Sequence, residues 1–547
     1  MLRSELQKAL DKATGIMNSN LEFASREEFG DYTSNVLVQN KLDARSVLGK
    51  LESDVELKKM VSKIDVAGPG FINFHLNTKT LLNNLSRIID EKNKYGHSTE
   101  GKGKTVVIDY SAPNIAKPFG IGHLRSTIIG QALYNLYQTL GYKVIGDNHL
   151  GDWGTQFGKL IYMIHERKIN LSELGIGKLE ELYVEFHREA GVNPHLEAKA
   201  REWFKKLEEG DPYARKVWKA CIETSMKEFD KVYETLGVKI DFALGESFYE
   251  EEMKKMLNDP VIIGHLKTGE GGAKVIDLKE YGIDVPLMFV KSDGATTYAA
   301  RDLATIKYRV ERWNPDIIIY EVSVEQEFHF RQVFAAARIL GLVRDDVVLY
   351  HTKHGWYLGP DGKKFSTRAG KTVKLNDILE EAVERARKFN DNEEVARAVG
   401  VGAIKYYDLM RDVKTNVVFD WNKIFLLEGN SGPYLQYTYA RCHSVLAKKS
   451  STEYSVMGNE NINQEELSIL RALVKFPEVI QLAAEKYSPN LLCEYLYKLA
   501  SSYNTFYNKF RIIGSREEQF RLALTFGVGQ VIKNGLTLLG IDAPVKM

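Results

Sequence analysis

The chain has 547 residues, which is too many for one hydrophobic core, so we expect roughly three to four domains. Its 44% hydrophobic and 27% charged residues are typical of globular proteins, and its net charge of +1 carries no overall nucleic-acid signature. The first residues have no apolar core of the kind a secretory signal requires, so we expect none, and no apolar run has membrane length. Three cysteines, none in a CxxC pair, exclude a Cys-rich zinc site and favour a reducing, cytoplasmic location.

Residues 1–98 predict a small α+β domain. Apolar residues at helical spacing cover Leu2 to Met17 and Ala44 to Val61. Residues 78–100 are polar and charged and end in a Gly-Lys repeat, so we expect a connection between domains there.

A short strand at 71–74 follows the chain-breaking sequence Gly68-Pro69-Gly70. Phe71 and Asn73 on this strand could contact the bases of a folded RNA by stacking and hydrogen bonding. Taken alone, a core Phe and a turn Asn are the commoner outcome.

The second domain, expected over 99–385, opens with a β-branched run at 106–108 that predicts a buried parallel strand. A loop with two prolines and two glycines follows, and then a helix over 124–140. A strand, a Gly-containing loop and a helix N-terminus together form an anion site, because free N–H groups and the helix dipole converge there.

The loop does not match the common phosphate-binding fingerprints. Both the dinucleotide pattern and the P-loop pattern fail around Gly120 and Gly122. His123 and Lys117 flank the glycines instead, which indicates phosphates bound partly by side chains. A plain strand-to-helix turn is the alternative for such a short signal.

Further buried strands are predicted at 238–242, 285–290, 316–320 and 347–351, alternating with helices. This alternation favours a doubly wound, Rossmann-like parallel sheet. A charged helical segment over about 160–240 is expected to be an insertion between the two halves of the sheet.

A glycine-rich basic loop spans 355–370 and shows no hydrophobic period. Lys363, Lys364, Ser366, Thr367 and Arg368 fall within six residues, so the loop could close over a polyphosphate. A solvated surface loop is the alternative.

The remaining residues, 386–547, predict an all-helical domain. Tyr and Arg are interleaved there, around Tyr434, Tyr437, Tyr503 and Tyr507. This pattern suits stacking on unpaired bases with phosphate contacts nearby, although many of these Tyr could equally be core residues.

Several motifs resemble the class I aminoacyl-tRNA synthetases, and specifically the arginyl-tRNA synthetase family. They are SAPNIAKPFGIGHLRSTIIG, NHLGDWGTQFG, TTYAARDLATIKYR, KFSTRAG and VVFDWNKIFLLEGNSGPYLQYTYARCHS, with GLTLLGIDAPVKM at the end and FGDYTSN and AGPGFINFHL near the start. Because they occur in family order along the whole chain, the resemblance is far more specific than any single motif.

The resemblance implies an arginine–tRNA ligase. ATP would activate L-arginine to arginyl-adenylate with release of pyrophosphate, and the arginyl group would pass to the terminal ribose of tRNA(Arg). Such chemistry depends on positioning and charge stabilisation, which agrees with the absence of a nucleophilic triad pattern in the sequence. Mg²⁺ is expected with ATP, and zinc is not.

Both family signatures are altered. The HIGH motif is Gly120-Ile121-Gly122-His123, so its first His is replaced by Gly120, and Lys117 is expected to compensate. The KMSKS motif is Lys364-Phe365-Ser366-Thr367-Arg368, without its second Lys. We therefore expect Lys117, His123, Lys364, Ser366 and Arg368 to be catalytic, and Gly120, Gly122, His123 and Lys364 to bind ATP.

Arginine selection requires carboxylates. Tyr298 and Asp302 are spaced i, i+4 and share a helix face, and a carboxylate there can accept a bidentate guanidinium. By resemblance, Glu246 and Gln326 join this pocket, and Asn114 and His123 hold the α-amino or carboxylate end. Ala112 replaces a Ser that is frequent in the family.

The resemblance also implies tRNA contacts at both ends of the chain. Phe71 and Asn73 would meet the D-loop, and the helical domain would hold the anticodon. The candidates there are Tyr434, Tyr437, Tyr503, Tyr507 and Met547, the last residue.

Two alternatives stay open from the sequence. One is a class I synthetase for another amino acid, which the acidic residues Glu246 and Asp302 and the missing Cys/His zinc cluster disfavour. The other is a non-catalytic tRNA-binding paralogue, which the altered HIGH and KMSKS motifs favour. We expect a monomer that does not contact membranes.

Overall fold

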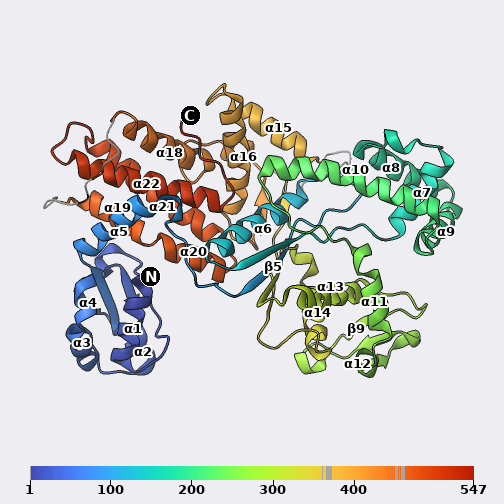
Figure 1. The fold of residues 1–547 in the computed structure, drawn as a ribbon, viewed down its shortest axis with the longest axis horizontal. Helices are drawn as coiled ribbons and strands as arrows, with labels where there is room; N and C mark the ends of the chain where they lie inside the picture. Colours follow the sequence, from blue (N-terminus) through green and yellow to red (C-terminus); the bar gives the residue numbers. More distant parts are fainter. Residues whose placement is uncertain (1, 360, 365–372, 450–453, 455, 457–461) are drawn as a thin grey trace.

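The computed structural model describes residues 2–359, 361–364, 373–449, 454, 456 and 462–547. Figure 1 shows an N-terminal α+β domain beneath a C-terminal helical bundle, with a central domain beside them that extends into two lobes. This arrangement confirms the expected fold class. Within the described ranges, no helix is long and apolar enough to cross a membrane.

The N-terminal domain packs short helices on an antiparallel sheet of order β1-β2-β4-β3. Its elements are α1 (Leu2–Thr14), β1 (Glu22–Phe23), β2 (Tyr32–Ser34), α2 (Val36–Asn40), α3 (Ala44–Ser53), α4 (Val55–Met60), β3 (Val61–Ala67) and β4 (Phe71–Leu76). The single helix predicted from residue 44 to 61 is two helices. Asp54 ends the first and caps the second, since its carboxylate accepts the N–H groups of Glu56 and Leu57, each at 3.0 Å.

The polar connection predicted at 78–100 is wrong for its first half, which forms α5 (Thr78–Glu91). Leu81, Leu85 and Ile88 recur on one face and are buried against the C-terminal bundle, and the charged residues occupy the other face. The sequence was polar on average but amphipathic at helical spacing.

Buried polar contacts hold the N-terminal domain on the C-terminal bundle. The Tyr32 hydroxyl donates to Glu478 Oε1 at 2.8 Å, and Asp31 lies 3.3 Å from Arg471. Burial raises the pKa of Glu478 to about 7. The two ends of the chain therefore form one continuous structure.

The central domain is built on a parallel sheet of order β11-β10-β5-β6. Its strands are β5 (Thr105–Asp109), β6 (Lys143–Asp147), β10 (Ile317–Tyr320) and β11 (Val348–His351). Val106 and Ile108 face one hydrophobic core and Val107 faces another, so both faces are covered. This burial explains the continuous β-branched run in the sequence.

Helices surround this sheet and build the two lobes seen at the right of Figure 1. Helix α6 (Gly122–Thr139) follows β5 directly. The helical lobe contains α7 (Thr155–Glu166), α8 (Ile176–Val192), α9 (His195–Glu208) and α10 (Pro212–Leu236). The second lobe contains α11 (Glu250–Leu257), α12 (Pro260–His265), β7 (Leu266–Thr268), β8 (Lys274–Ile276), β9 (Leu287–Val290), α13 (Tyr298–Trp313) and α14 (Glu327–Ile339).

Two strand predictions require correction. The strand expected at 285–290 exists as β9, but it pairs antiparallel with β8 in a separate sheet, β7-β8-β9. The segment 238–242 is not a strand: only Phe242 makes an isolated bridge, to Asp147. A hydrophobic run indicates a buried strand but does not specify its partner.

The C-terminal bundle packs on α6 and on the end of α10. The elements from β12 onward, in which β12 pairs with β13, are β12 (Tyr357–Leu358), α15 (Leu375–Ala386), α16 (Glu393–Leu409), β13 (Val417–Val418), α17 (Trp421–Ile424), α18 (Gly432–Leu446), α19 (Gln464–Val474), α20 (Phe476–Glu485), α21 (Asn490–Lys509) and α22 (Glu518–Leu538). A buried ion pair, Arg125–Asp408 at 3.1 Å, joins α6 to α16. The Lys405 ammonium donates to the Leu236 carbonyl at 2.6 Å, which ties α16 to α10.

Candidate active site

The site lies at the carboxyl edge of the parallel sheet. The chain leaves β5 toward β6 on one side and β10 toward β11 on the other, so the topology switches between β5 and β10. Such a switch point opens a crevice in which α/β proteins bind ligands. The loop after β5 enters α6 at this point, as the sequence predicted.

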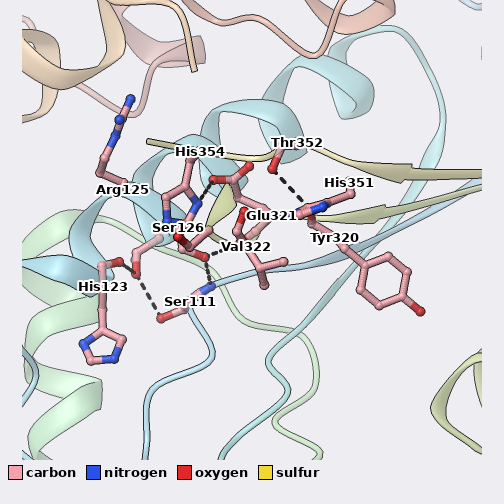
Figure 2. A network of polar contacts seen from close by, with 12 residues as sticks. Ser111, His123, Arg125, Ser126, Tyr320, Glu321, Val322, His351, Thr352 and His354 are labelled. Carbon is pink, nitrogen blue, oxygen red and sulfur yellow. Dashed lines mark hydrogen bonds and ion pairs between the residues drawn. The ribbon is translucent and has the colours of Figure 1, made fainter. Parts of the chain in front are cut away.

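The loop after β5 has an unusual backbone. Ser111, Ala112 and Ala116 have φ of 76°, 45° and 64°, in the left-handed region that L residues rarely adopt. Each costs on the order of 1–3 kcal/mol, and such residues cluster at functional sites. The Ser111 N–H donates to Ser126 Oγ at 2.9 Å (Figure 2). The Thr127 hydroxyl donates to the Ser111 hydroxyl at 2.9 Å.

Helix α10 holds the same loop from outside. Ser225 Oγ accepts the Ala116 N–H at 2.8 Å, and the Tyr233 hydroxyl lies 2.9 Å from Ser111 Oγ. Asn148 links the two, since it accepts the Ala112 N–H at 3.0 Å and donates to the Tyr233 hydroxyl at 2.9 Å. These hydrogen bonds could not be predicted from the sequence, because nothing in the neighbouring residues marks one hydroxyl on a charged helix as a contact to a distant loop.

The predicted phosphate-binding groups lie around the start of α6. Gly122 is its first residue and is exposed, and the His123 ring packs edge-on against Phe119 at 5.2 Å. Burial lowers the pKa of His123 to about 4, so its imidazole is neutral at pH 7. Lys117 is exposed, with its ammonium 5.5 Å from the Tyr183 ring centre.

Lys364 of the basic loop pairs through its backbone with Leu358. Its ammonium contacts Glu325 and stands 4.3 Å from the Trp356 ring centre. Ser366 and Arg368, which we also expected to be catalytic, lie outside the described residues.

An ion cluster that the sequence did not reveal supports the sheet edge. Arg309 of α13 is fully buried and lies 2.7 Å from Asp109 and 2.8 Å from Asp147, the last residues of β5 and β6. The one sequence feature that indicates this cluster is an aspartate at the end of each of the two strands. The cluster fixes the two strands to α13, the helix that carries the predicted arginine pocket.

Two carboxylates of that pocket already contact side chains of the chain that can donate hydrogen bonds. Glu246 lies 3.4 Å from the Arg301 guanidinium, and Asp302 lies 2.5 Å from His329 Nε2. Burial raises the pKa of Glu246, and the nearby Asp302 adds to this. The two carboxylates therefore lie in one acidic region, in which Glu246 already contacts a guanidinium of the chain.

The turn that carries Glu246 is fixed by Asp152. Its carboxylate accepts the Ser247 N–H at 2.8 Å and the Ser247 hydroxyl at 2.5 Å. A Cβ on Gly245 would lie 2.3 Å from this carboxylate, so glycine is required there. Among the described residues, no group of three or more His, Cys, Asp or Glu could hold a metal ion.

The other predicted arginine-binding residues lie at the rim. Tyr298 begins α13, is 67% exposed and stacks on Arg301, with 5.4 Å between the guanidinium and the ring centre. Gln326 is exposed in the short 3-10 helix Val324–Gln326. Asn114 is exposed and pairs through its backbone with Gly151.

The two predicted tRNA residues of the N-terminal domain differ in access. Phe71 is 40% exposed on β4. Asn73 is buried, accepts the Thr33 hydroxyl and donates to Asp65, both at 3.0 Å. A direct tRNA contact by Asn73 is therefore not supported, since its amide is already bonded within the sheet.

The tyrosines predicted for the anticodon also differ. Tyr437 and Tyr507 flank the Arg441 guanidinium, with ring centres at 4.9 and 4.7 Å, in a partly exposed cluster. Tyr434 borders it through Asn504, which donates to the Tyr434 hydroxyl at 2.9 Å. Tyr503 is fully buried and serves as a core residue, which corrects its predicted role. Met547 is partly buried against the core.

Family models match almost the whole chain. The model described as "tRNA synthetases class I (R), catalytic domain" matches residues 84–421. The "Arginyl tRNA synthetase N terminal domain" matches residues 1–76, and the "DALR anticodon binding domain" matches residues 435–547.

Similar proteins agree with these matches. The chain is 39% identical to arginine–tRNA ligase 1 of Bacillus thuringiensis over 542 residues, which cover 96% of this chain and 95% of that protein. It is 41% identical to the arginine–tRNA ligase of Enterococcus faecalis, over 89% and 87% of the two chains. The fold matches the Thermus thermophilus arginyl-tRNA synthetase with a TM-score of 0.85 at 23% identity, over 100% of both chains. The chain belongs to the arginyl-tRNA synthetase family of class I aminoacyl-tRNA synthetases.

Proposed function

We propose that this protein is an arginine–tRNA ligase. It activates L-arginine with ATP, releases pyrophosphate and transfers the arginyl group to the terminal ribose of tRNA(Arg). The observation that carries the proposal is the position of two carboxylates, Glu246 and Asp302, beside a phosphate-binding loop in a chain of this family.

The acidic pocket supports arginine as the amino acid. Glu246 already binds the guanidinium of Arg301, so the substrate guanidinium can replace an equivalent group. Asp302 offers a second acceptor, and two carboxylates can be bridged by a planar guanidinium more readily than by an ammonium. A substrate with an acidic side chain would be repelled.

Activation forms one bond and breaks another at phosphorus. The arginine carboxylate attacks the α-phosphate, and the bond between this phosphorus and the pyrophosphate oxygen breaks. We assign Lys117 and Lys364 to the charge of the departing pyrophosphate, and the start of α6 to the phosphates. Mg²⁺ enters with ATP, held mainly by phosphate oxygens and water.

For tRNA we propose two contacts. Phe71 would stack at the outer corner of the tRNA, and Tyr437, Arg441 and Tyr507 would hold an anticodon base by stacking and cation–π contact. We further propose that the protein acts as a monomer in the cytoplasm.

A charging assay tests this function. Purified protein is mixed with ATP, total tRNA and each labelled amino acid in turn. Charging with arginine alone is the expected result. Charging with another amino acid, or intact tRNA binding without charging, would contradict the proposal.

A further inference from the structure

Position 120 lacks the imidazole that the family motif provides. Gly120 is buried, and its backbone pairs with Lys374 in an isolated antiparallel bridge. Its φ lies outside the left-handed region, so the backbone itself does not require glycine. His123 is therefore the one imidazole left in the motif, and it is neutral at pH 7 because burial lowers its pKa to about 4.

A second imidazole lies at the same edge of the sheet. His354 follows β11 and is 6% exposed, and its Nδ1 lies 2.9 Å from Glu321 Oε1. Glu321 follows β10 directly and is fully buried, and no group among the described residues bonds its Oε2. A buried carboxylate–imidazole contact adds little net stability even when the ring is protonated, because desolvation offsets the attraction. Stability alone therefore does not account for it.

The pair is bonded directly to the phosphate-binding loop. The Glu321 carbonyl accepts the Ser126 hydroxyl at 2.5 Å, and Ser126 Oγ accepts the Ser111 N–H at 2.9 Å. Figure 2 shows His354 beside the first turn of α6, which also carries His123, and the two imidazoles lie within electrostatic range of each other. His354 thus stands at the β5–β10 switch point.

The two ring nitrogens of His354 have different environments. Nδ1 faces the Glu321 carboxylate, and among the described residues no side chain or backbone group bonds Nε2. An imidazolium donates from both nitrogens, and a carboxylate behind the ring orients it and balances its charge.

We propose that His354 donates Nε2–H to the ATP phosphates and takes the place of the imidazole missing at Gly120, with Glu321 as its positioning residue. The inference rests on the proposed ligase function. It assigns a catalytic role to a residue outside both signature motifs.

The first test compares His354→Ala with His351→Gln. His351 is the matched control, because it lies three residues earlier, is similarly buried and has its Nε2 3.0 Å from the Val322 carbonyl rather than beside a carboxylate. In pyrophosphate exchange with tRNA present, His354→Ala should lower kcat by about 10- to 100-fold, as expected for loss of one charge-stabilising donor. The KM for arginine and the activity of the control should stay near wild type. An unchanged kcat in His354→Ala would overturn the inference.

A second variant separates catalysis from folding. Glu321→Leu with His354→Phe replaces the ion pair by apolar side chains and leaves no buried charge behind, so its Tm should equal or exceed that of the wild type. Its kcat should still fall as in His354→Ala. A fully active double variant would overturn the inference.

The decisive step is rescue. Gly120→His added to either background should recover at least about 10-fold of the lost kcat if the two imidazoles share one role. Failure to rescue in both backgrounds would contradict that role. If the wild type does not charge arginine at all, the ligase function fails instead, so the two failures are distinguishable.

Discussion

The two halves of the site are built differently. The ATP half is fixed by the fold: backbone N–H groups of the Ser111–Ala116 loop bond to buried hydroxyls and an amide from α6, α10 and the segment after β6. In the arginine half, the carboxylates of Glu246 and Asp302 pair with Arg301 and His329. Folding completes the first half, whereas we propose that the second exchanges its contacts with Arg301 and His329 for contacts with the substrate.

This difference has an energetic consequence. Backbone strain at three loop residues is offset by hydrogen bonds within the protein, so the ATP half is already organised before substrate enters. In the proposed arginine half, the substrate must first displace Arg301 from Glu246 and His329 from Asp302, and this competition disfavours ligands that lack a charged guanidinium. The variants below are designed to act on one half alone.

Asp302→Ala should have the largest effect. Removing one partner of a partly buried charged contact costs about 2–5 kcal/mol, so the KM for arginine should rise by about 100-fold. The KM for ATP should change little, since Asp302 contacts α14 rather than the phosphate loop.

The matched control for this variant is Asp345→Ala, which removes an exposed carboxylate between α14 and β11. It should behave as the wild type. An unchanged arginine KM in Asp302→Ala would remove Asp302 from the pocket.

Lys117→Met should act on the other half. The Met side chain keeps most of the packing against Tyr183 but loses the charge. We expect kcat for adenylate formation to fall by about 10-fold or more, with the arginine KM nearly constant. Steady-state pyrophosphate exchange measures both, and a rise in the arginine KM alone would show that Lys117 belongs to the opposite half.

Glu246→Gln should have a smaller effect than Asp302→Ala, because Gln retains an acceptor oxygen for the guanidinium. Loss of the charge should raise the KM for arginine by about 10-fold, since charge-assisted hydrogen bonds are roughly twice as strong as neutral ones. The variant should lose less affinity for competing arginine analogues without the guanidinium charge than for charged ones. Equal losses of affinity for charged and neutral analogues would contradict an electrostatic role.

Ser225→Ala tests the rigidity of the ATP half. It leaves the Ala116 N–H buried without an acceptor, which should lower the free energy of unfolding by about 1–3 kcal/mol and raise the KM for ATP a few-fold. Thr224→Ala on the same helix is the control, because its hydroxyl makes only a long contact, at 3.5 Å, to Leu174. Chemical denaturation of both variants would show a difference only if the loop depends on α10.

The smallest expected effect is in the pH dependence, where the two halves should have opposite signs. The folded-state pKa of His123 is about 4, below its ordinary value of 6.5. Its contribution to the free energy of unfolding is therefore lost as pH falls from 6.5 to 4. The folded-state pKa of Glu246 is raised above the ordinary glutamate pKa of 4.5. Its contribution to the free energy of unfolding is therefore present below pH 4.5 and is lost as pH rises.

Tm measured as a function of pH tests both contributions. His123→Gln should reduce the fall in Tm that the wild type shows as pH decreases below 6.5. Glu246→Gln should reduce the fall in Tm that the wild type shows as pH increases above 4.5. Identical changes in both variants would mean that the shifts do not originate in these groups.

The backbone elements on which the proposed ATP half depends could be predicted from the sequence. A buried strand, a loop with glycines and a helix start appear in order along the chain, and the structure has them as β5, the loop and α6. Local patterns of this kind specify local structure. The same locality explains the error at 285–290, where a correct strand joins a different sheet.

Long-range supports could not be predicted. Arg309, Tyr233 and Ser225 reach the site from helices far along the chain, and each is one polar residue among many on its helix. Nor does residue type reveal burial: Asn73 and Tyr503 suit RNA contact chemically, but both side chains are enclosed by neighbours that the sequence does not place.

The most direct test of the division into two halves is a double-mutant cycle of Asp302→Ala and Lys117→Met, measured as kcat/KM for adenylate formation. Groups that act on separate halves should give additive free energies, so the double variant should lose the product of the two single losses, within the usual error of about 0.5 kcal/mol. A loss far smaller or far larger than this product would show that the halves act as one unit and would contradict the account.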